Sequence, residues 1–247
     1  MKVKSILVTQ PHPETEKSPY FDLSKKFSVK IDFRPFIHVE GIPSVIFRKD
    51  RINIPEYSSV ILTSRHAADN FFRICIEMRV NDLENFKYFC VSESTAFYLQ
   101  KYMTFRKRKI FYGKQNIYDL IDVLKKHKRE KFLLPCSDIH KQEIPETLAQ
   151  HDIEFSKAVI YRTVCSDLSD LANVNYDMIV FFSPSGVASL FKNFPKFRQN
   201  NTRIAAFGMT TSQAVTDAGL RLDVKAPVPQ APSMTLAIEH YLKKANK

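Results

Sequence analysis

The chain has 247 residues, of which 44% are hydrophobic and 26% are charged, as in ordinary globular proteins. Lys and Arg number 37 against 26 Asp and Glu, and the formal net charge of +11 favours an anionic partner: nucleic acid, an acidic lipid surface or a polyanionic small molecule. Near the N-terminus only Ile6–Val8 is continuously apolar, whereas a signal peptide needs about 7–15 such residues and a membrane span about 20. We therefore expect a cytoplasmic protein.

The cysteines, Cys75, Cys90, Cys136 and Cys165, are dispersed along the chain and form no C-x-x-C pair. Metal clusters and disulfide-stabilised folds place their cysteines closer together and in recognisable patterns. We expect reduced thiols, most of them buried, and no metal site.

The first predicted elements are a strand with a polar turn, ILVTQPHP, and an extended segment, RPFIHV. Val60–Leu62 is a short apolar run, the pattern of a strand buried on both faces of a parallel sheet. Ser64 then stands at the N-cap of a helix whose apolar face is formed by Ala68, Phe71 and Phe72 at spacings i, i+3 and i+4. A strand, a polar turn and a helix follow one another here.

The next strand–turn–helix unit, FKYFCVSESTAFYL, begins at Phe86, and Ser94 or Thr95 is expected to cap its helix. FLLPCSDI, beginning at Phe132, is a further strand with a polar turn, and KAVIYRTV, beginning at Lys157, is a further extended segment. This part of the chain therefore has the same order of elements as the N-terminal part.

The C-terminal part starts with a buried strand at Met178–Phe182, after which Ser183 suits an N-cap and Pro184 a first helical position. Its last unit is TRIAAFGMTTSQAV, in which Thr210 or Thr211 is expected to cap a helix that ends at Gly219.

These units form an internal repeat. Tyr57–Phe72 (YSSVILTSRHAADNFF) matches Tyr176–Phe191 (YDMIVFFSPSGVASLF) at a separation of 119 residues. Downstream, Thr95 matches Thr211 at a separation of 116 residues, so one loop is shorter by 3 residues (119 − 116). ILVTQPHP and FLLPCSDI form a weaker third pair. Because alternating strands and helices build doubly wound sheets, the repeat predicts two similar α/β domains.

Hydroxyl-rich turns follow four of the predicted strands, at the edge where open α/β sheets bind ligands. The helix that starts in such a turn offers free backbone N–H groups and a favourable dipole to an anion. Ser and Thr are also ordinary helix caps, so a single turn of this kind is better explained as a cap. Four turns, two in each predicted domain, favour one ligand held by both. They are Thr63-Ser64, Ser92–Thr95, Ser183–Gly186 and Gly208–Thr211.

The common catalytic and nucleotide-binding motifs are absent from the sequence: there is no G-x-S-x-G elbow, Walker A loop, G-x-G-x-x-G or H-E-x-x-H. Arg106–Lys109 and Lys125–Arg129 are short basic runs, which are more often solvated surface than binding sites. No helix-turn-helix, zinc-finger or RNP signature accompanies them.

Four segments together resemble the uroporphyrinogen-III synthase family: LTSRHAADNFF (62–72), VIYRT (159–163), FFSPSGV (181–187) and FGMTTSQAV (207–215). They occur in the order of the family, and the resemblance covers nearly the whole chain. It implies two similar doubly wound parallel-sheet α/β domains, joined by a two-stranded connector, with one domain inserted in the other. Residues 1–39 and 161–247 would form the discontinuous domain, residues 40–160 the inserted domain, and FRPFIHV and VIYRT the connector.

The resemblance also implies an activity in heme and tetrapyrrole biosynthesis, that of a cyclising hydro-lyase. Hydroxymethylbilane, a linear tetrapyrrole with eight carboxylates, is closed to uroporphyrinogen III with loss of water and inversion of ring D. No cofactor or metal is expected, and no nucleic-acid or membrane partner; the expected state is a monomer.

The resemblance assigns roles to individual residues. Tyr161 matches the family tyrosine proposed to hydrogen-bond the departing hydroxyl, and a phenol is protonated at neutral pH and can donate. Without the resemblance, Tyr161 would be explained as a packed strand aromatic. The residues expected to bind the substrate are Thr63, Ser64, Arg65, Ser92, Ser94, Thr95, Cys136, Ser137, Ser183, Pro184, Ser185, Gly186, Gly208, Met209, Thr210 and Thr211.

Three features depart from the family pattern. Ser92 stands where the family often has Gly, and its Cβ would keep a carboxylate further from the backbone. Cys136 and Ser137 follow LLP where the family has a small residue, and Arg65 occupies a variable position.

Other functions remain open on the sequence alone. A non-catalytic sensor of the same fold could bind a tetrapyrrole or another polycarboxylate without needing Tyr161. A two-domain binding protein of the periplasmic type would be exported with a signal peptide. A nucleic-acid-binding protein would bind with a steep salt dependence.

Overall fold

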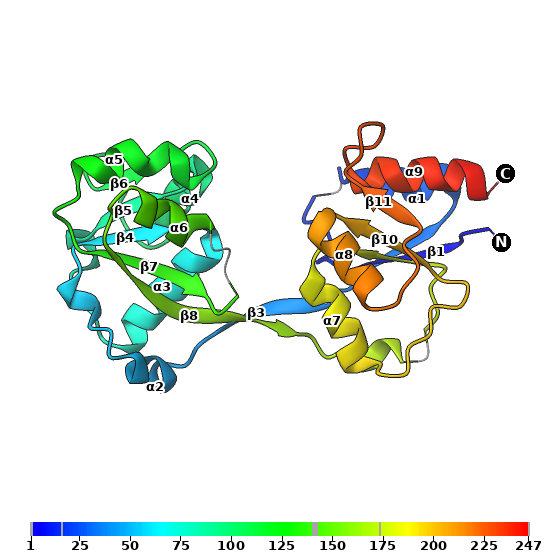
Figure 1. The fold of residues 1–247 in the computed structure, drawn as a ribbon, viewed down its shortest axis with the longest axis horizontal. Coiled ribbons are helices and arrows are strands. Elements are labelled where there is room, and N and C mark those ends of the chain that lie inside the picture. The colour runs from blue at the N-terminus through cyan, green and yellow to red at the C-terminus, as the bar shows by residue number, and fades with distance from the viewer. Residues whose placement is uncertain (1, 16, 140–142, 173, 247) are drawn as a thin grey trace. The chain divides into compact units, whose positions relative to one another are not determined.

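The computed structural model describes residues 2–15, 17–139, 143–172 and 174–246. The chain forms two compact units, which we call unit 1 (Met1–His38 with Val164–Lys247) and unit 2 (Val39–Thr163). Both chain termini belong to unit 1 (Figure 1). The domain boundaries implied by the resemblance are 39/40 and 160/161.

Unit 1 is built on a parallel sheet with the strand order β11-β10-β9-β1-β2. The N-terminal strand pairs with β9, with Leu7 opposite Ile179, so the N-terminal residues complete the sheet of the C-terminal part. The strands are β1 Ser5–Val8, β2 Lys30–Phe33, β9 Met178–Phe181, β10 Arg203–Phe207 and β11 Val224–Ala226.

Helices cover both faces of this sheet, which is why β9 is apolar along its whole length and β1 is apolar from Ile6 to Val8. α7 and α8 pack Leu190 and Val215 against one face, and α1 and α9 pack Leu23 and Ile238 against the other. The helices are α1 Pro19–Phe27, α7 Pro184–Asn193, α8 Met209–Asp217 and α9 Met234–Ala245.

Unit 2 has the sheet order β3-β8-β7-β4-β5-β6, in which β4 to β8 are parallel. α3 and α4 pack Phe71 and Ala96 on one face, and α5 and α6 pack Leu124 and Leu148 on the other. The strands are β3 Ile37–Gly41, β4 Ser59–Leu62, β5 Lys87–Cys90, β6 Ile110–Tyr112, β7 Phe132–Ser137 and β8 Phe155–Cys165. The helices are α2 Ser44–Phe47, α3 Arg65–Glu77, α4 Glu93–Tyr98, α5 Ile121–Lys126 and α6 Glu143–Gln150.

The two sheets share one spatial order but the chain runs through them differently. The order β8-β7-β4-β5-β6 in unit 2 corresponds to β2-β1-β9-β10-β11 in unit 1. β4 thus corresponds to β9 and β5 to β10, which are the pairs of the sequence repeat, and β7 corresponds to β1, the weaker pair. This arrangement confirms the prediction of two similar doubly wound α/β sheets.

The chain passes between the units within β3 and β8, which are neighbours in the sheet of unit 2. Arg73 on α3 binds the backbone of both connecting segments on the unit 2 side. Its Nη2 donates to the carbonyls of Ile42 at 2.9 Å and Ile160 at 3.0 Å. Gly41 makes room for the guanidinium, because a Cβ at that position would lie 2.4 Å from Arg73 Nε.

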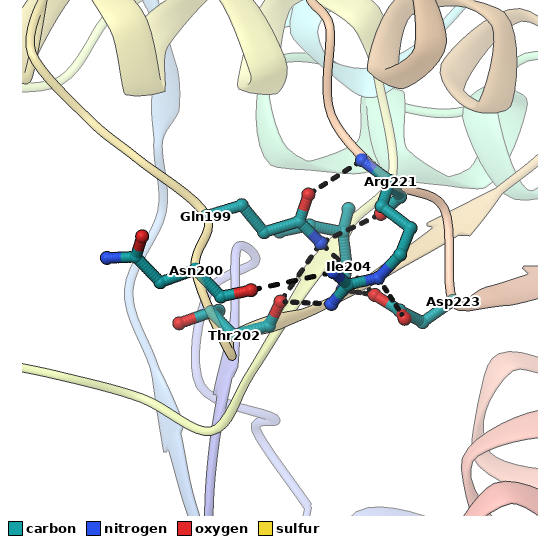
Figure 2. A network of polar contacts seen from close by, with 6 residues as sticks. All are labelled: Gln199, Asn200, Thr202, Ile204, Arg221 and Asp223. Atoms are coloured by element: carbon teal, nitrogen blue, oxygen red, sulfur yellow. Dashed lines mark hydrogen bonds and ion pairs between the residues drawn. The ribbon is translucent and has the colours of Figure 1, made fainter.

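A network of polar contacts lies at the amino end of β10 in unit 1. Figure 2 shows the Gln199 amide between the turns that precede β10 and β11. Its Nε2 donates to the carbonyls of Thr202 and Arg221, each at 2.9 Å, and its Oε1 accepts from the Arg221 amide at 2.6 Å. Asp223 accepts from Gln199 and from the Ile204 amide. The network therefore joins both turns at the edge opposite the helix-starting turns.

Candidate functional site

The carboxyl ends of β4, β7 and β8 bring several predicted residues of unit 2 together. Thr63 directly follows β4, and Ser137 at the end of β7 is the register partner of Tyr161 on β8. A pocket of about 230 Å³ lies at this edge. Its lining consists of Thr63, Leu134, Cys136, Ser137, Ile139, Ile144, Pro145 and Tyr161.

Tyr161 is the central titratable group of this pocket. Its side chain is buried, with 9% of the residue exposed, and burial raises its pKa above the ordinary value. Hydrogen bonds with the side chains of Ser64 and Thr63 lower the pKa, but by less than burial raises it. The phenol therefore keeps its proton at neutral pH and is a hydrogen-bond donor.

Cys136 lies in β7 and is buried. Burial raises the pKa of its thiol to about 11, and the charge of Lys157 lowers it by less. The thiol is therefore neutral at physiological pH and is not activated as a nucleophile. Its contribution to the pocket is that of a small apolar surface.

Asp138, which the sequence reasoning missed, fixes the loop after β7. Its Oδ1 accepts from the Ser137 hydroxyl and the Ile139 amide at 2.8 Å each, and from the Thr163 amide at 3.3 Å. Its own amide donates to the Tyr161 carbonyl at 3.1 Å. Burial raises the pKa of Asp138, but these hydrogen bonds outweigh burial and hold the pKa below its ordinary value. A carboxylate directly after the strand in FLLPCSDI was the available signal.

Ser64 caps α3, as predicted: its Oγ accepts from the Ala67 amide at 3.1 Å. Arg65, the first residue of this helix, is exposed, and its guanidinium lies 5.4 Å from the centre of the Tyr98 ring. Since Arg65 forms no salt bridge with any of the residues described, its charge can act on an anion near the start of α3.

The turn before α4 differs from its prediction. Ser92, not Ser94 or Thr95, is the N-cap, and its Oγ accepts from the Thr95 amide at 3.3 Å. The three hydroxyls also bond one another, since Ser92 Oγ lies 3.1 Å from Ser94 Oγ and 3.0 Å from Thr95 Oγ1. Thr95 is buried, so Ser94 is the exposed hydroxyl of this turn.

Ser183 caps α7 as predicted, with its Oγ accepting from the Gly186 amide at 3.1 Å, and Pro184 is the first helical residue. Because Pro184 has no N–H and the Gly186 amide is used by the cap, Ser185 has the amide of this turn that remains for a ligand. Thr9, which the sequence reasoning missed, follows β1 beside this turn and donates its hydroxyl to the Val180 carbonyl at 2.8 Å. The polar turn of ILVTQPHP was the signal for it.

The turn before α8 also differs from its prediction, and it is the most open of the four. Gly208 precedes the helix in place of the expected Thr210 or Thr211, with φ +88° and ψ 154°, a region that only Gly adopts readily. Gly208 is the N-cap residue, but since it has no side chain it forms no side-chain capping hydrogen bond. Within the described residues, the amides of Met209, Thr210 and Thr211 form no hydrogen bond. The Thr211 side chain is buried, whereas Met209 is 80% exposed.

The predicted residues therefore gather at two carboxyl edges, one in each unit. Those of unit 2 follow β4 and β5 or lie at the end of β7 and on β8, and those of unit 1 follow β9 and β10. Over the ranges that the structure covers, no three His, Cys, Asp or Glu side chains come together as a metal site. In the same part of the chain, no helix is long and apolar enough to span a membrane.

The family described as Uroporphyrinogen-III synthase HemD matches residues 21–235, most of the chain. The chain belongs to the uroporphyrinogen-III synthase family. Family membership makes it an enzyme of tetrapyrrole biosynthesis, a cyclising lyase, and confirms the resemblance seen in the four sequence segments.

Individual proteins agree with this assignment. The chain is 22% identical over 256 residues to the uroporphyrinogen-III synthase of Chlorobaculum parvum, and the match covers 98% of this chain and 100% of that protein. The fold is similar to that of the uroporphyrinogen-III synthetase of Helicobacter pylori, with a TM-score of 0.61, 18% identity and coverage of 97% and 99%. It is also similar to a mutant synthase from Thermus thermophilus, with a TM-score of 0.54, 15% identity and coverage of 98% and 99%.

Proposed function

We propose that this chain closes hydroxymethylbilane to uroporphyrinogen III, with Tyr161 as the hydrogen-bond donor to the departing hydroxyl. The observation that supports this most is the environment of Tyr161: a buried, protonated phenol among Thr63 and Ser64, in a pocket at the carboxyl edge of unit 2. Carboxyl edges are where open α/β sheets bind ligands. The alternative of a non-catalytic sensor gives this phenol no task, and the family match favours the enzyme.

The first chemical step is loss of the terminal hydroxyl of the linear substrate. The C–O bond breaks, the electron pair leaves with oxygen, and a proton delivered to that oxygen releases water and leaves a cationic azafulvene. Tyr161 supplies the hydrogen bond or proton, which typically contributes 10²–10⁴-fold to a rate. The apolar walls at Leu134 and Ile144 reduce competition by water and so strengthen this hydrogen bond.

The following steps need orientation more than covalent chemistry. Ring D attacks the cationic carbon through its substituted position, the resulting spiro centre opens, and ring D recloses in the inverted direction with loss of a proton. A protein that holds the chain in the geometry of the spiro centre lowers the entropic part of the barrier. The protein must then bind the carboxylates of the other rings.

We propose that the four turns bind these carboxylates, and that the turn before α8 contributes most. It has three free amides at the positive end of a helix dipole, next to the exposed side chain of Met209. An amide set of this kind suits a carboxylate, and an exposed thioether suits the face of a pyrrole ring. The net charge of +11 would add attraction at longer range.

We further propose that the protein acts as a cytoplasmic monomer without nucleic-acid or membrane partners. The cysteines support a reducing compartment: Cys75, Cys90 and Cys136 are buried, Cys165 is partly buried, and all are free thiols. The monomeric state rests on the family resemblance.

The decisive experiment is the isomer of the product. Purified protein is incubated with hydroxymethylbilane, the products are oxidised to porphyrins, and isomers I and III are separated by chromatography. Spontaneous closure does not invert ring D and yields isomer I, so we expect isomer III to dominate when the protein is present. Binding of hydroxymethylbilane with isomer I as the product would identify a sensor and overturn the proposal.

A further inference from the structure

A second pocket, of about 450 Å³, lies within unit 1 on the side of the sheet that α7 covers. Its floor consists of the core side chains Leu7, Phe36, Ile179 and Leu190, all buried. These residues pack against one another on one side and face the pocket on the other. A cavity of about 300–1,000 Å³ with an apolar floor is typical of small-molecule sites.

This pocket is separate from the candidate active site. Tyr176 and Thr202, which line it, precede β9 and β10, so it lies toward the amino edge of the sheet. Leu190 and Phe194 contribute from the C-terminal end of α7, whereas Ser183 stands at the other end of that helix. Ten helical residues at about 1.5 Å each place the two ends roughly 15 Å apart.

The walls offer aromatic surface and few free polar groups. Phe194 and Phe197 are half-buried in the pocket wall. Tyr176 adds its ring, because its hydroxyl already donates to Asp32 at 2.9 Å. The Thr202 hydroxyl is likewise used, since it donates to the Tyr176 carbonyl at 3.0 Å. The interior therefore suits an apolar ring system.

The mouth of the pocket has polar groups without partners. Lys196 and Asn175 line it and are exposed, and neither side chain forms a hydrogen bond or ion pair with a residue that the structure describes. One cation at the mouth of an apolar cavity complements a ligand with a ring and one anionic group. The substrate of the enzyme does not match, because one lysine cannot neutralise eight carboxylates.

We propose that this pocket binds a small aromatic carboxylate or sulfonate, with its ring system on the Leu7–Leu190 floor and its anionic group at Lys196. The site holds one ligand per chain and is independent of the cyclisation chemistry, since none of its residues belongs to the turns or to the Tyr161 pocket. Ligand and substrate can therefore be bound at the same time.

The test uses the full-length protein and 1-anilinonaphthalene-8-sulfonate as the probe, followed by fluorescence titration and by calorimetry for stoichiometry. We expect saturable binding of one probe per chain. Ala172→Trp, at the exposed mouth, should weaken binding at least tenfold by filling the entrance. Lys196→Gln should weaken it about two- to fivefold, the range of an exposed ion pair.

Matched controls are available in unit 2, where Ala149 and Lys128 are also exposed. Ala149→Trp and Lys128→Gln should bind the probe as the unchanged protein does, and every variant should still produce isomer III. Circular dichroism of each variant excludes probe binding to partly unfolded chains. Unsaturable binding, or undiminished binding by Ala172→Trp, would overturn the proposal.

Discussion

The turns before α4 and α8 occupy equivalent places in the duplicated fold, and one of the differences between them has a large consequence. The repeat aligns Ser92 with Gly208, just as it aligns Thr95 with Thr211. In unit 2, Ser92 adopts extended backbone and its side chain occupies the Thr95 amide. In unit 1, Gly208 adopts φ +88° and leaves the Thr211 amide without a partner within the described chain. The turn before α4 thus satisfies the Thr95 amide with its own side chain, whereas the turn before α8 leaves the Thr211 amide available to a ligand.

A second difference separates the chemistry of the two units. β8 carries Tyr161 at the carboxyl edge of unit 2, whereas its counterpart β2, Lys30–Phe33, contains no tyrosine. We infer a division of labour in which unit 2 supplies the proton donor and unit 1 the more open anion cradle. The comparison teaches that duplicated sheets can share a fold while each edge is specialised by a few residues.

The largest expected effect comes from Tyr161→Phe, which removes the donor and keeps the ring. We expect kcat to fall about 10²–10⁴-fold, the usual worth of general acid assistance, while KM and the circular dichroism spectrum change little. The fraction of isomer I should rise as spontaneous closure competes. An unchanged rate and isomer ratio would show that Tyr161 only packs in the strand and does not act as the donor.

The next largest effect should follow from closing the open turn with Gly208→Ser. A side chain at φ +88° and ψ 154° costs about 1–3 kcal/mol of backbone strain, and relief of that strain by a Ser92-like turn would consume the Thr211 amide. Loss of one hydrogen bond to a carboxylate, worth about 1.5–3 kcal/mol, should raise KM at least about tenfold.

Gly219→Ser is the matched control for this strain. Gly219 has φ +72°, lies after the C-terminal end of α8, and has no atom within 4 Å of an added Cβ. We expect a similar loss of stability without a change in KM. A KM that rises equally in both variants would mean that strain in α8, and not the open amides, sets substrate affinity.

At the opposite edge of unit 1, Gln199→Ala should destabilise the sheet without affecting the substrate. Gln199 joins the turns before β10 and β11, so its loss should cost about 1–3 kcal/mol. Hydrogen exchange of β10 amides measures the local effect. Gln213→Ala, which breaks one exposed contact to Asp217, should stay within about 0.5 kcal/mol. Equal exchange rates in both variants would show that the network adds no stability.

Ser183→Ala should have a smaller effect, about 0.5–2 kcal/mol of stability, because it removes the cap on the Gly186 amide. Ser185→Pro should affect the substrate more than Ser183→Ala does, since it removes the remaining free amide of that turn. Urea unfolding and KM of both variants separate the two roles. Substrate affinity unchanged in a folded Ser185→Pro variant would contradict the cradle at α7.

The smallest effect concerns pH. Because burial raises the pKa of Tyr161, the protonated donor persists below that pKa and is lost only as the pH rises through it. We therefore expect no loss of kcat from this group between pH 7 and 9, and a decline above about pH 10, beyond the ordinary pKa of tyrosine. The decline should be missing in Tyr161→Phe. A Tyr161-dependent decline near neutral pH would contradict the buried, protonated phenol.

The sequence alone predicted the features that depend on local order. The Ser64 and Ser183 caps, the apolar runs of β4 and β9 and the duplicated α/β sheets follow from residue spacing, because caps and helix faces depend on neighbours within about four positions. The resemblance to the family likewise rested on four short segments that occur in the right order along the chain.

The tertiary structure alone decided which distant residues meet. Tyr161 meets Thr63 and Ser64, and Asp138 meets Thr163, because parallel register brings β4, β7 and β8 to one edge, and register depends on pairing between segments far apart in the chain. The position of Gly208 as the N-cap of α8 could not be predicted from the sequence either. Its positive φ follows from how the turn leaves β10 and not from a hydroxyl nearby. The pocket above Leu7 and Leu190 likewise exists because two loops and a helix end leave a core face uncovered, a property of packing that no local pattern records.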